Sequence, residues 1–418
     1  MSGIERSREA TGGKVIQRRS ALSTSGPVLA ALVALAAVVG LSGCVSMVAL
    51  DHAVVTYDRT TADSVSKQLL LNIARARHNE PMHFTAISSI AATYKFGVNA
   101  GLGGAVTGER GGLLVPLFGA SAEENPTISI SPMQGEEFTG RLLTPFSEQK
   151  LTLLLRQGYD VDALLRLMGA ELRLQHGTTG RRDSFKNRPT DSVGYPVFRR
   201  VMAQLSALQD LHALHVEPLH FQHNWTVPAA SVTPETFQSI YKDFSTTYDV
   251  ARNVYRVSYR ITGRVLITNY DPATLPNEER VRLHEEAEEA PFNDILVDIR
   301  PGHTGGEFPI HGRLRLRSFH EILTFIGRGL AEEREYDVVP DPRTPGIQEN
   351  PTTTLEIVEA RSPPPGDGLS VALNGSYYSI RPESGYQWNR KAFSLLYQLF
   401  QMSVSTAAQP GPAITIAK

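Results

Sequence analysis

A short apolar run that ends at the chain's one cysteine constrains this sequence more than any other feature. The run extends from Val28 to Leu41, which is shorter than the roughly 20 residues that a transmembrane helix needs. Five basic side chains precede it, namely Arg6, Arg8, Lys14, Arg18 and Arg19. Because a basic segment followed by a short apolar run is typical of a secretory signal, we expect residues 1–43 to be a signal peptide.

The residues that follow the run suggest how the mature chain is held. Leu41-Ser42-Gly43-Cys44 resembles the lipobox of bacterial lipoproteins, which signal peptidase II cleaves. The resemblance implies that Cys44 becomes the first residue and carries acyl chains such as palmitate. Two or more acyl chains hold a protein firmly at a bilayer. Val45, where an aspartate would favour the inner membrane, implies an outer-membrane anchor with the folded part in the periplasm or exposed at the cell surface.

Charge and cysteine content exclude several classes of partner. The whole chain has a net charge of -2, and residues 1–43 carry five basic and two acidic residues, so their removal makes the chain more acidic. This balance argues against nucleic-acid binding and against attraction to anionic lipid. The expected membrane contact is therefore the lipid on Cys44. A single cysteine excludes an internal disulfide and a thiolate metal cluster.

Helical and strand patterns alternate without a regular βαβ rhythm, which predicts an α+β fold of two mixed units of comparable size behind the signal and an N-terminal helix. Three segments, LLLNIARAR, PTISISPMQGEEF and WNRKAFSLLYQLF, resemble those of uncharacterised envelope lipoproteins, a resemblance that implies no activity. We expect an anchor and helix over 44–81, a strand and glycine-rich hairpin segment over 82–126, a first α+β unit over 127–225, a second over 226–404, and a flexible tail over 405–418.

Local motifs define several elements. Ser318 and Glu321 form a capping box, Thr233-Pro234 is typical of a helix start, and Asn374-Gly375 is a hairpin turn dipeptide. Hydrophobic periodicity adds the rest. It predicts helices over 51–77, across 134–174, over 196–211, 277–287 and 389–404, strands over 127–131, 216–221, 294–300 and 313–316, one long strand or a hairpin bent at Gly263 over 255–270, and loops over 177–194 and 337–351.

Residues 94–120 form the most unusual segment. Tyr94 to Leu102 alternates apolar with polar or glycine residues, a glycine-rich turn follows, and a second apolar stretch runs from Leu113 to Ala120. One interpretation is a half-buried hairpin with a mobile tip. The alternative is a strand pair that several subunits contribute to a membrane barrel, because nine alternating residues match the about 9–11 of a membrane strand. Pro116 and the weak alternation of the second arm oppose the alternative.

Arginines alternate with leucines over residues 313–317. A strand there would bury Leu314 and Leu316 and align Arg313, Arg315 and Arg317 on the opposite face. Such a row suits binding of phosphate or carboxylate groups, from lipid headgroups to cell-wall polymers. The alternative is that these arginines pair with the acidic helix that holds Glu278, Glu279, Glu285, Glu286, Glu288 and Glu289.

Four of the twelve histidines fall within twelve residues, at His212, His215, His220 and His223. Imidazole groups could bind zinc, but the spacing from His215 to His220 places them on opposite faces of a straight strand. The favoured interpretation is that these histidines are solvated at the edge of a domain. A metal site would require a bend at Pro218 that brings the histidines to one side.

No G-x-S-x-G, H-E-x-x-H or Walker motif occurs. We therefore interpret the chain as a non-enzymatic envelope lipoprotein without a cofactor, acting as a structural or interaction module that contacts the membrane through Cys44. An envelope protein, a cell-wall polymer or further copies of the chain would be its partners. The alternatives are a subunit of an oligomeric outer-membrane pore built from the 94–120 hairpin, and a periplasmic metal-dependent hydrolase using the histidines.

Overall fold

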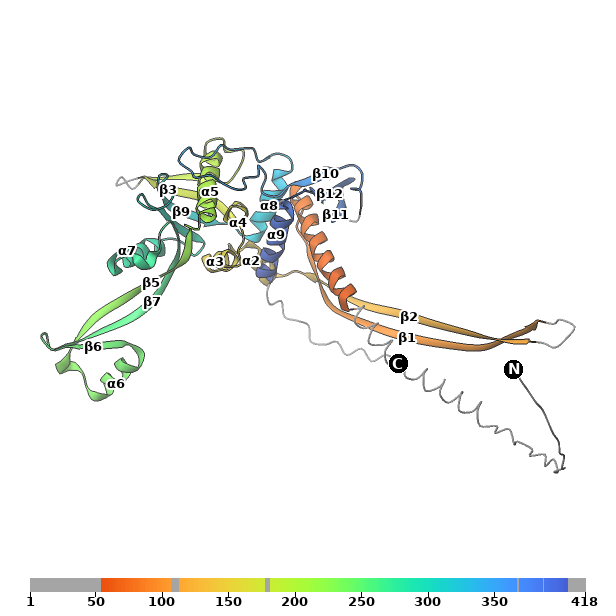
Figure 1. Cartoon of the computed structure of the whole chain (residues 1–418), viewed down its shortest axis with the longest axis horizontal. Coiled ribbons are helices and arrows are strands. Elements are labelled where there is room, and N and C mark those ends of the chain that lie inside the picture. The colour runs from red at the N-terminus through yellow and green to blue at the C-terminus, as the bar shows by residue number, and fades with distance from the viewer. Residues whose placement is uncertain (1–53, 107–112, 177–180, 367, 386, 405–418) are drawn as a thin grey trace, which may run out of the picture. The chain divides into compact units, whose positions relative to one another are not determined.

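The computed structural model describes residues 54–106, 113–176, 181–366, 368–385 and 387–404 (Figure 1). The chain divides by its contacts into residues 1–60 and 61–418. Cys44 and the tail over 405–418 lie outside the described residues. The predicted α+β class is confirmed, with helices and mixed sheets throughout. None of the described helices is long and apolar enough to cross a membrane.

One seven-stranded sheet forms the centre of the unit over residues 61–418. Its order is β4-β3-β9-β8-β7-β5, with β6 also paired to β7. All pairs are antiparallel except β7 with β8. The strands are β3 Gly169–His176, β4 Arg181–Lys186, β5 His215–Pro228, β6 Ser245–Asp249, β7 Val254–Thr268, β8 Asp294–Ile299 and β9 Ile310–Leu316.

Strand β7 joins two parts of this sheet. It pairs with β5 along its whole length. On its other side, its first residues pair with β6 and its last residues, Leu266 to Thr268, pair with β8. The β5–β7 pair therefore extends beyond the main sheet and carries β6, the turn η2 (Ala229–Ser231) and helix α6 (Pro234–Asp243) at its far end (Figure 1).

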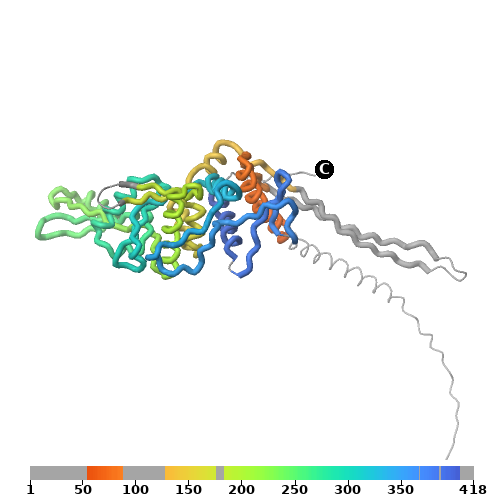
Figure 2. The backbone as a smooth tube through the Cα atoms, turned by 90° about the horizontal axis from the view of Figure 1, so that it is seen from above, coloured from red at the N-terminus to blue at the C-terminus, as the bar shows by residue number. Residues whose placement is uncertain are grey.

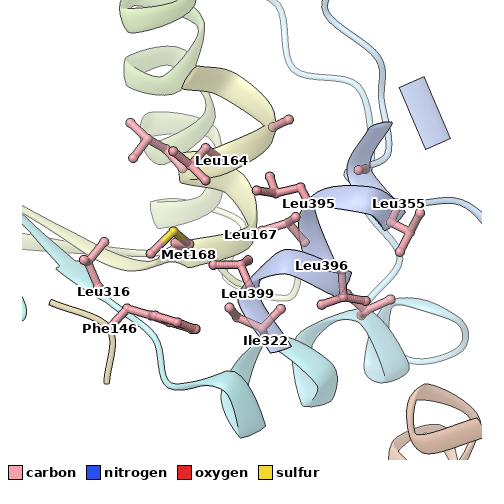
Figure 3. Packing of buried hydrophobic residues seen from close by; sticks show 14 of the residues in the cluster. Phe146, Leu164, Leu167, Met168, Leu316, Ile322, Leu355, Leu395, Leu396 and Leu399 are labelled. Carbon is pink, nitrogen blue, oxygen red and sulfur yellow. The ribbon is translucent and has the colours of Figure 1, made fainter. Parts of the chain in front are cut away.

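The main core lies where helices pack together beside the sheet. In Figure 3, Leu167 and Met168 of α4 lie beside Leu395 and Leu399 of α9, with Ile322 of α8 next to them. The helices are α2 Glu136–Leu143, α3 Glu148–Arg156, α4 Val161–Met168, α5 Gly194–Asp210, α7 Asn277–Glu288, α8 Phe319–Gly329 and α9 Trp388–Val404, with a further helix over residues 54–77 and the turn η3 Pro272–Thr274. A smaller cluster of apolar side chains packs under α7.

A second sheet of three strands lies near α8 and α9. Its order is β10-β12-β11, from β10 Ile357–Ala360, β11 Ser370–Leu373 and β12 Ser376–Ile380. Asn374 and Gly375 connect β11 to β12 with positive φ angles of 49° and 78°, as a type I′ turn requires. The hairpin predicted from this dipeptide is confirmed.

Other local predictions are confirmed as well. Ser318 and Glu321 form the capping box at the start of α8. The Thr233 side chain accepts a hydrogen bond from the backbone N–H of Thr236 at the start of α6. Helices occur where periodicity predicts them at α5, α7 and α9, and the helix over 54–77 ends before Pro81. Of the two interpretations of residues 255–270, the single long strand is correct.

Three predictions are corrected. The helical stretch expected over 134–174 stops at Met168, where the chain continues as β3 because β4 and β9 pair with it on either side. The loop expected over 177–194 contains β4, which pairs with β3. Residues 127–131 are part of β2 (Leu113–Met133) and form no separate strand.

The boundary expected between the two units falls inside a strand. Residues 225 and 226 lie within β5, and strands from both sides of this point pair in the seven-stranded sheet. β3, from the expected first unit, lies between β4 and β9, and β9 belongs to the expected second unit. Strands from both expected units, from β3 to β9, therefore belong to one sheet, and the main core draws residues from both.

Buried arginines hold the long irregular segment after α8 against the helices. This segment runs along α5 (Figure 2). Arg166 of α4 is fully buried and contacts Asp162 at 3.1 Å and Glu335 at 3.5 Å. Its guanidinium also donates to the carbonyl oxygens of Pro351 and Thr352, each at 2.8 Å. The Arg166 guanidinium thus connects α4 to both ends of the irregular segment that follows α8.

We expect Arg166→Met to destabilise the protein by about 3–5 kcal/mol, because it leaves the carboxylates of Asp162 and Glu335 buried without their shared cation. Arg343→Met is the matched control, since Arg343 pairs with Asp341 at the surface and its loss should leave the urea midpoint nearly unchanged. Urea unfolding followed by tryptophan fluorescence measures both. Equal stability of the two variants would contradict the assignment.

Candidate functional site

The hairpin predicted over residues 94–120 is much longer than the sequence indicated. Strand β1 runs from Phe84 to Val106 and pairs antiparallel with β2 from end to end. The two strands form a separate two-stranded sheet, and neither pairs with any other strand of the described residues. The irregularities in register fall between Ile87 and Ser89 and between Gly103 and Val106.

The register aligns the alternating segment with a specific part of β2. Residues 94–102 pair with 124–116, so Phe96, Val98 and Ala100 stand opposite Ala122, Ala120 and Phe118. Positions directly opposite one another in an antiparallel pair share a face. Three successive members of the apolar set of β1 are therefore paired with residues that are apolar by sequence, whereas Tyr94 is paired with Glu124.

The predicted arginine row is partly correct. In β9, Leu314 and Leu316 are buried while Arg313 and Arg315 are partly exposed, as alternation requires. Arg313 donates to the backbone carbonyl of Glu286 at 2.5 Å and lies 3.4 Å from the Glu289 carboxylate. Arg315 instead lies 3.4 Å from Glu171 of β3. The expected pairing with the acidic helix therefore applies to Arg313 and not to Arg315.

Arg317 does not belong to the row, so the prediction of three aligned guanidiniums is wrong. The strand ends at Leu316, and Arg317 is 5% exposed. Its guanidinium donates to the carbonyl oxygens of Arg166 and Leu167 at the end of α4, and to that of Asn187. Burial lowers the pKa of Arg317 to about 10. The side chain caps α4, where its charge suits the helix dipole, and does not face solvent.

The four clustered histidines do not converge. His212 is exposed and has a positive φ just after α5, while His215 lies 3.4 Å from Glu217. His220 lies 3.3 Å from Thr262, and the His223 ring lies 5.7 Å from that of Trp225. β5 has a register shift between Pro218 and His220, but no group of three metal ligands occurs in the described part of the chain. Nothing there favours the metal-dependent hydrolase.

A polar cluster that the sequence analysis missed surrounds His311. Its Nδ1 lies 3.0 Å from Asp298 and its Nε2 lies 2.9 Å from Glu286 of α7. Asp298 also accepts hydrogen bonds from the Tyr270 hydroxyl at 2.5 Å and from Arg300 at 2.6 Å. The sequence did contain a signal for this cluster, because His311 lies two and four residues before Arg313 and Arg315 and so shares their face of β9.

This cluster suits a structural imidazolium better than a catalytic base. Hydrogen bonds to Asp298 and Glu286 raise the pKa of His311 to about 9, and those from His311 lower the pKa of Glu286. Burial acts to raise the pKa of Asp298, but its bonds to His311 and Tyr270 keep it below its usual range. With both ring nitrogens bound to carboxylates, His311 has no free nitrogen to accept a proton from a substrate.

No protein-family model matches this chain, and neither a curated protein nor a solved structure is detectably similar to it.

The raised pKa of His311 predicts a stability that depends on pH. The protonated ring stabilises the fold fully below the unfolded value of about 6.5, and this contribution is lost as the pH rises through about 9. One third of the side chain is exposed, so solvent screening reduces the contribution to about 1–2 kcal/mol.

We expect His311→Gln to lower the urea midpoint at pH 6 and to flatten its pH dependence between 6.5 and 9. His223→Gln is the control, because His223 is exposed and its loss should leave the profile unchanged. A His311→Gln profile parallel to that of the unmodified protein would contradict the assignment.

Proposed function

We propose that this chain is an acylated envelope lipoprotein, anchored in the outer membrane through Cys44, with its folded part in the periplasm. It acts as a non-enzymatic interaction module, and the β1–β2 hairpin is the part through which it assembles. The observation that carries this proposal is the pairing of β1 and β2 with each other alone among the described strands.

Such a hairpin has two open edges. Each outer edge presents backbone N–H and C=O groups that no described strand satisfies. Two-stranded hairpins are only marginally stable by themselves, and open edges recruit further strands. A hairpin with paired arms of 23 and 21 residues therefore favours association with other strands along its length.

Further copies of the same hairpin are the partner that this geometry suits best. In lipid, only a closed barrel satisfies both edges of a hairpin. At about 3.3 Å per residue, the arms are about 70 Å long, more than twice the roughly 30 Å of a bilayer's hydrocarbon core. The paired segments 94–102 and 116–124, of nine residues each, are about the length of one membrane crossing. We therefore propose an oligomeric outer-membrane pore as the assembled form.

The anchor makes the first prediction of this proposal. Cys44→Ser should abolish incorporation of an azide-tagged palmitate and leave the precursor at full length, because the acylated sulfur is missing. Ser46→Ala, two residues later, should label and mature normally. Labelling detected by gel fluorescence measures both, and a labelled Cys44→Ser protein would contradict the anchor assignment.

The hairpin makes the second prediction of this proposal. Val98 belongs to the apolar set and Asn99 to the alternate set. A lysine on a lipid-facing position costs about 2–4 kcal/mol per strand at the bilayer midplane. We therefore expect Val98→Lys to abolish detergent-stable oligomers and conductance in planar bilayers, whereas Asn99→Lys should retain both.

Mass photometry of detergent-extracted protein measures the oligomers. A native chain that stays monomeric and non-conducting would refute the pore. Oligomers equally affected by both lysines would show that the two sets do not face different surroundings.

A further inference from the structure

A groove of about 400 Å³ lies between the C-terminal half of α8 and strand β10. Its walls differ in character. One wall is made of side chains, including Phe325, Ile326 and Leu330. The other is the extended chain from Thr353 to Glu359.

The strand wall has an open edge that faces the groove. Among the described strands, β10 pairs with β12 alone and so lies at the edge of its sheet. The Arg381 N–H donates to the Glu356 carbonyl at 2.9 Å, which identifies Glu356 as a residue that bonds toward β12. In an antiparallel pair such residues alternate with residues whose peptide groups point the other way. The backbone groups of Leu355, Ile357 and Glu359 therefore point away from β12, and all three residues line the groove.

These backbone groups have no hydrogen-bond partner within the described chain. Asn389 completes the β12 side, since its side chain accepts from the Glu356 N–H and donates to the Arg381 carbonyl. Nothing equivalent completes the groove side over the residues described. The edge thus offers alternate N–H and C=O groups over five residues, which is the arrangement to which an extended peptide adds as a further strand.

The charges at the groove favour an acidic ligand. Each of the three carboxylates in its lining already has a cationic partner: Glu335 lies 3.5 Å from Arg166, Glu356 lies 2.7 Å from Arg381 and Glu359 lies 3.8 Å from Arg77. Arg334 also lines the groove and is exposed. No acidic side chain of the described residues pairs with it, so one positive charge remains uncompensated.

We propose that this groove binds an extended, acidic peptide segment of a partner protein, which adds as a strand to the free edge of β10. Apolar side chains of that segment lie against Phe325 and Leu330, and an acidic side chain lies near Arg334. The chain's own residues 405–418 contain no Asp or Glu, so they offer no acidic side chain to Arg334. This site is separate from the hairpin, so its test is independent of the proposed pore.

The probe is a phage-displayed library of random decapeptides, selected on the purified mature chain. We expect enriched peptides to alternate apolar residues and to carry Asp or Glu. Leu330→Asp should weaken their binding at least tenfold by fluorescence anisotropy, and Arg334→Glu should weaken it with the fold intact by circular dichroism. Leu153→Asp is the control, because Leu153 is 53% exposed on α3, outside the groove lining. Failure to enrich peptides, or binding unaffected by Leu330→Asp, would overturn the proposal.

Two further measurements test the mode of binding and the occupant. Methylation of alternate backbone nitrogens in the best peptide should abolish binding for one set of positions and spare the other, because only one set of N–H groups faces β10. Equal losses for both sets would overturn strand addition. A chain truncated after Val404 should bind the peptide as the full chain does. A tenfold gain on truncation would identify the tail as the occupant and overturn the assignment to a partner protein.

Discussion

Buried arginines satisfy the backbone of the irregular segments, and the packing of this fold depends on them. Buried carbonyl groups need hydrogen-bond donors, and a guanidinium supplies five in a fixed geometry. Arg166 and Arg199 hold the segment after α8 through Pro351 and Thr352. Arg264, which is partly buried, donates to four carbonyl oxygens between Ala287 and Asp294, and Arg317 caps the end of α4.

This use of arginine explains why the alternating pattern wrongly predicted that Arg317 lies in a row with Arg313 and Arg315. Alternation with leucine predicted the side of β9 on which Arg313 and Arg315 lie, because parity along a strand is a local property. It could not predict where the strand ends. Leu316 and Arg317 donate their backbone N–H groups to Asn293 and Met168, and both partners are distant in sequence. The same alternation, followed towards the start of β9, places His311 on the face of Arg313 and Arg315. It could not predict the carboxylate partners of His311, because they come from β8 and α7.

The same distinction between local and distant causes holds for the fold. Elements with a cap or a turn motif, such as α6, α8 and the β11–β12 hairpin, could be predicted because the decisive hydrogen bonds lie within a few residues. The change from α4 to β3 could not, since β3 is a strand because β4 and β9 pair with it. The boundary at 225/226 failed for the same reason, because sheet order depends on pairing between segments far apart in sequence.

The edges of the sheets differ in how open they are to a further strand. The edge strand β5 carries Pro218, Pro228 and a register shift, features that discourage strand addition. The hairpin arms extend for more than twenty residues beside no other described strand. The edge of β10 is short but has an apolar wall opposite it. A long bare edge suits repeated pairing with identical strands, whereas a short edge inside a groove admits one strand and selects it by its side chains. The two interactions that we propose therefore differ in stoichiometry, with many copies of the chain at the hairpin and a single peptide segment at β10.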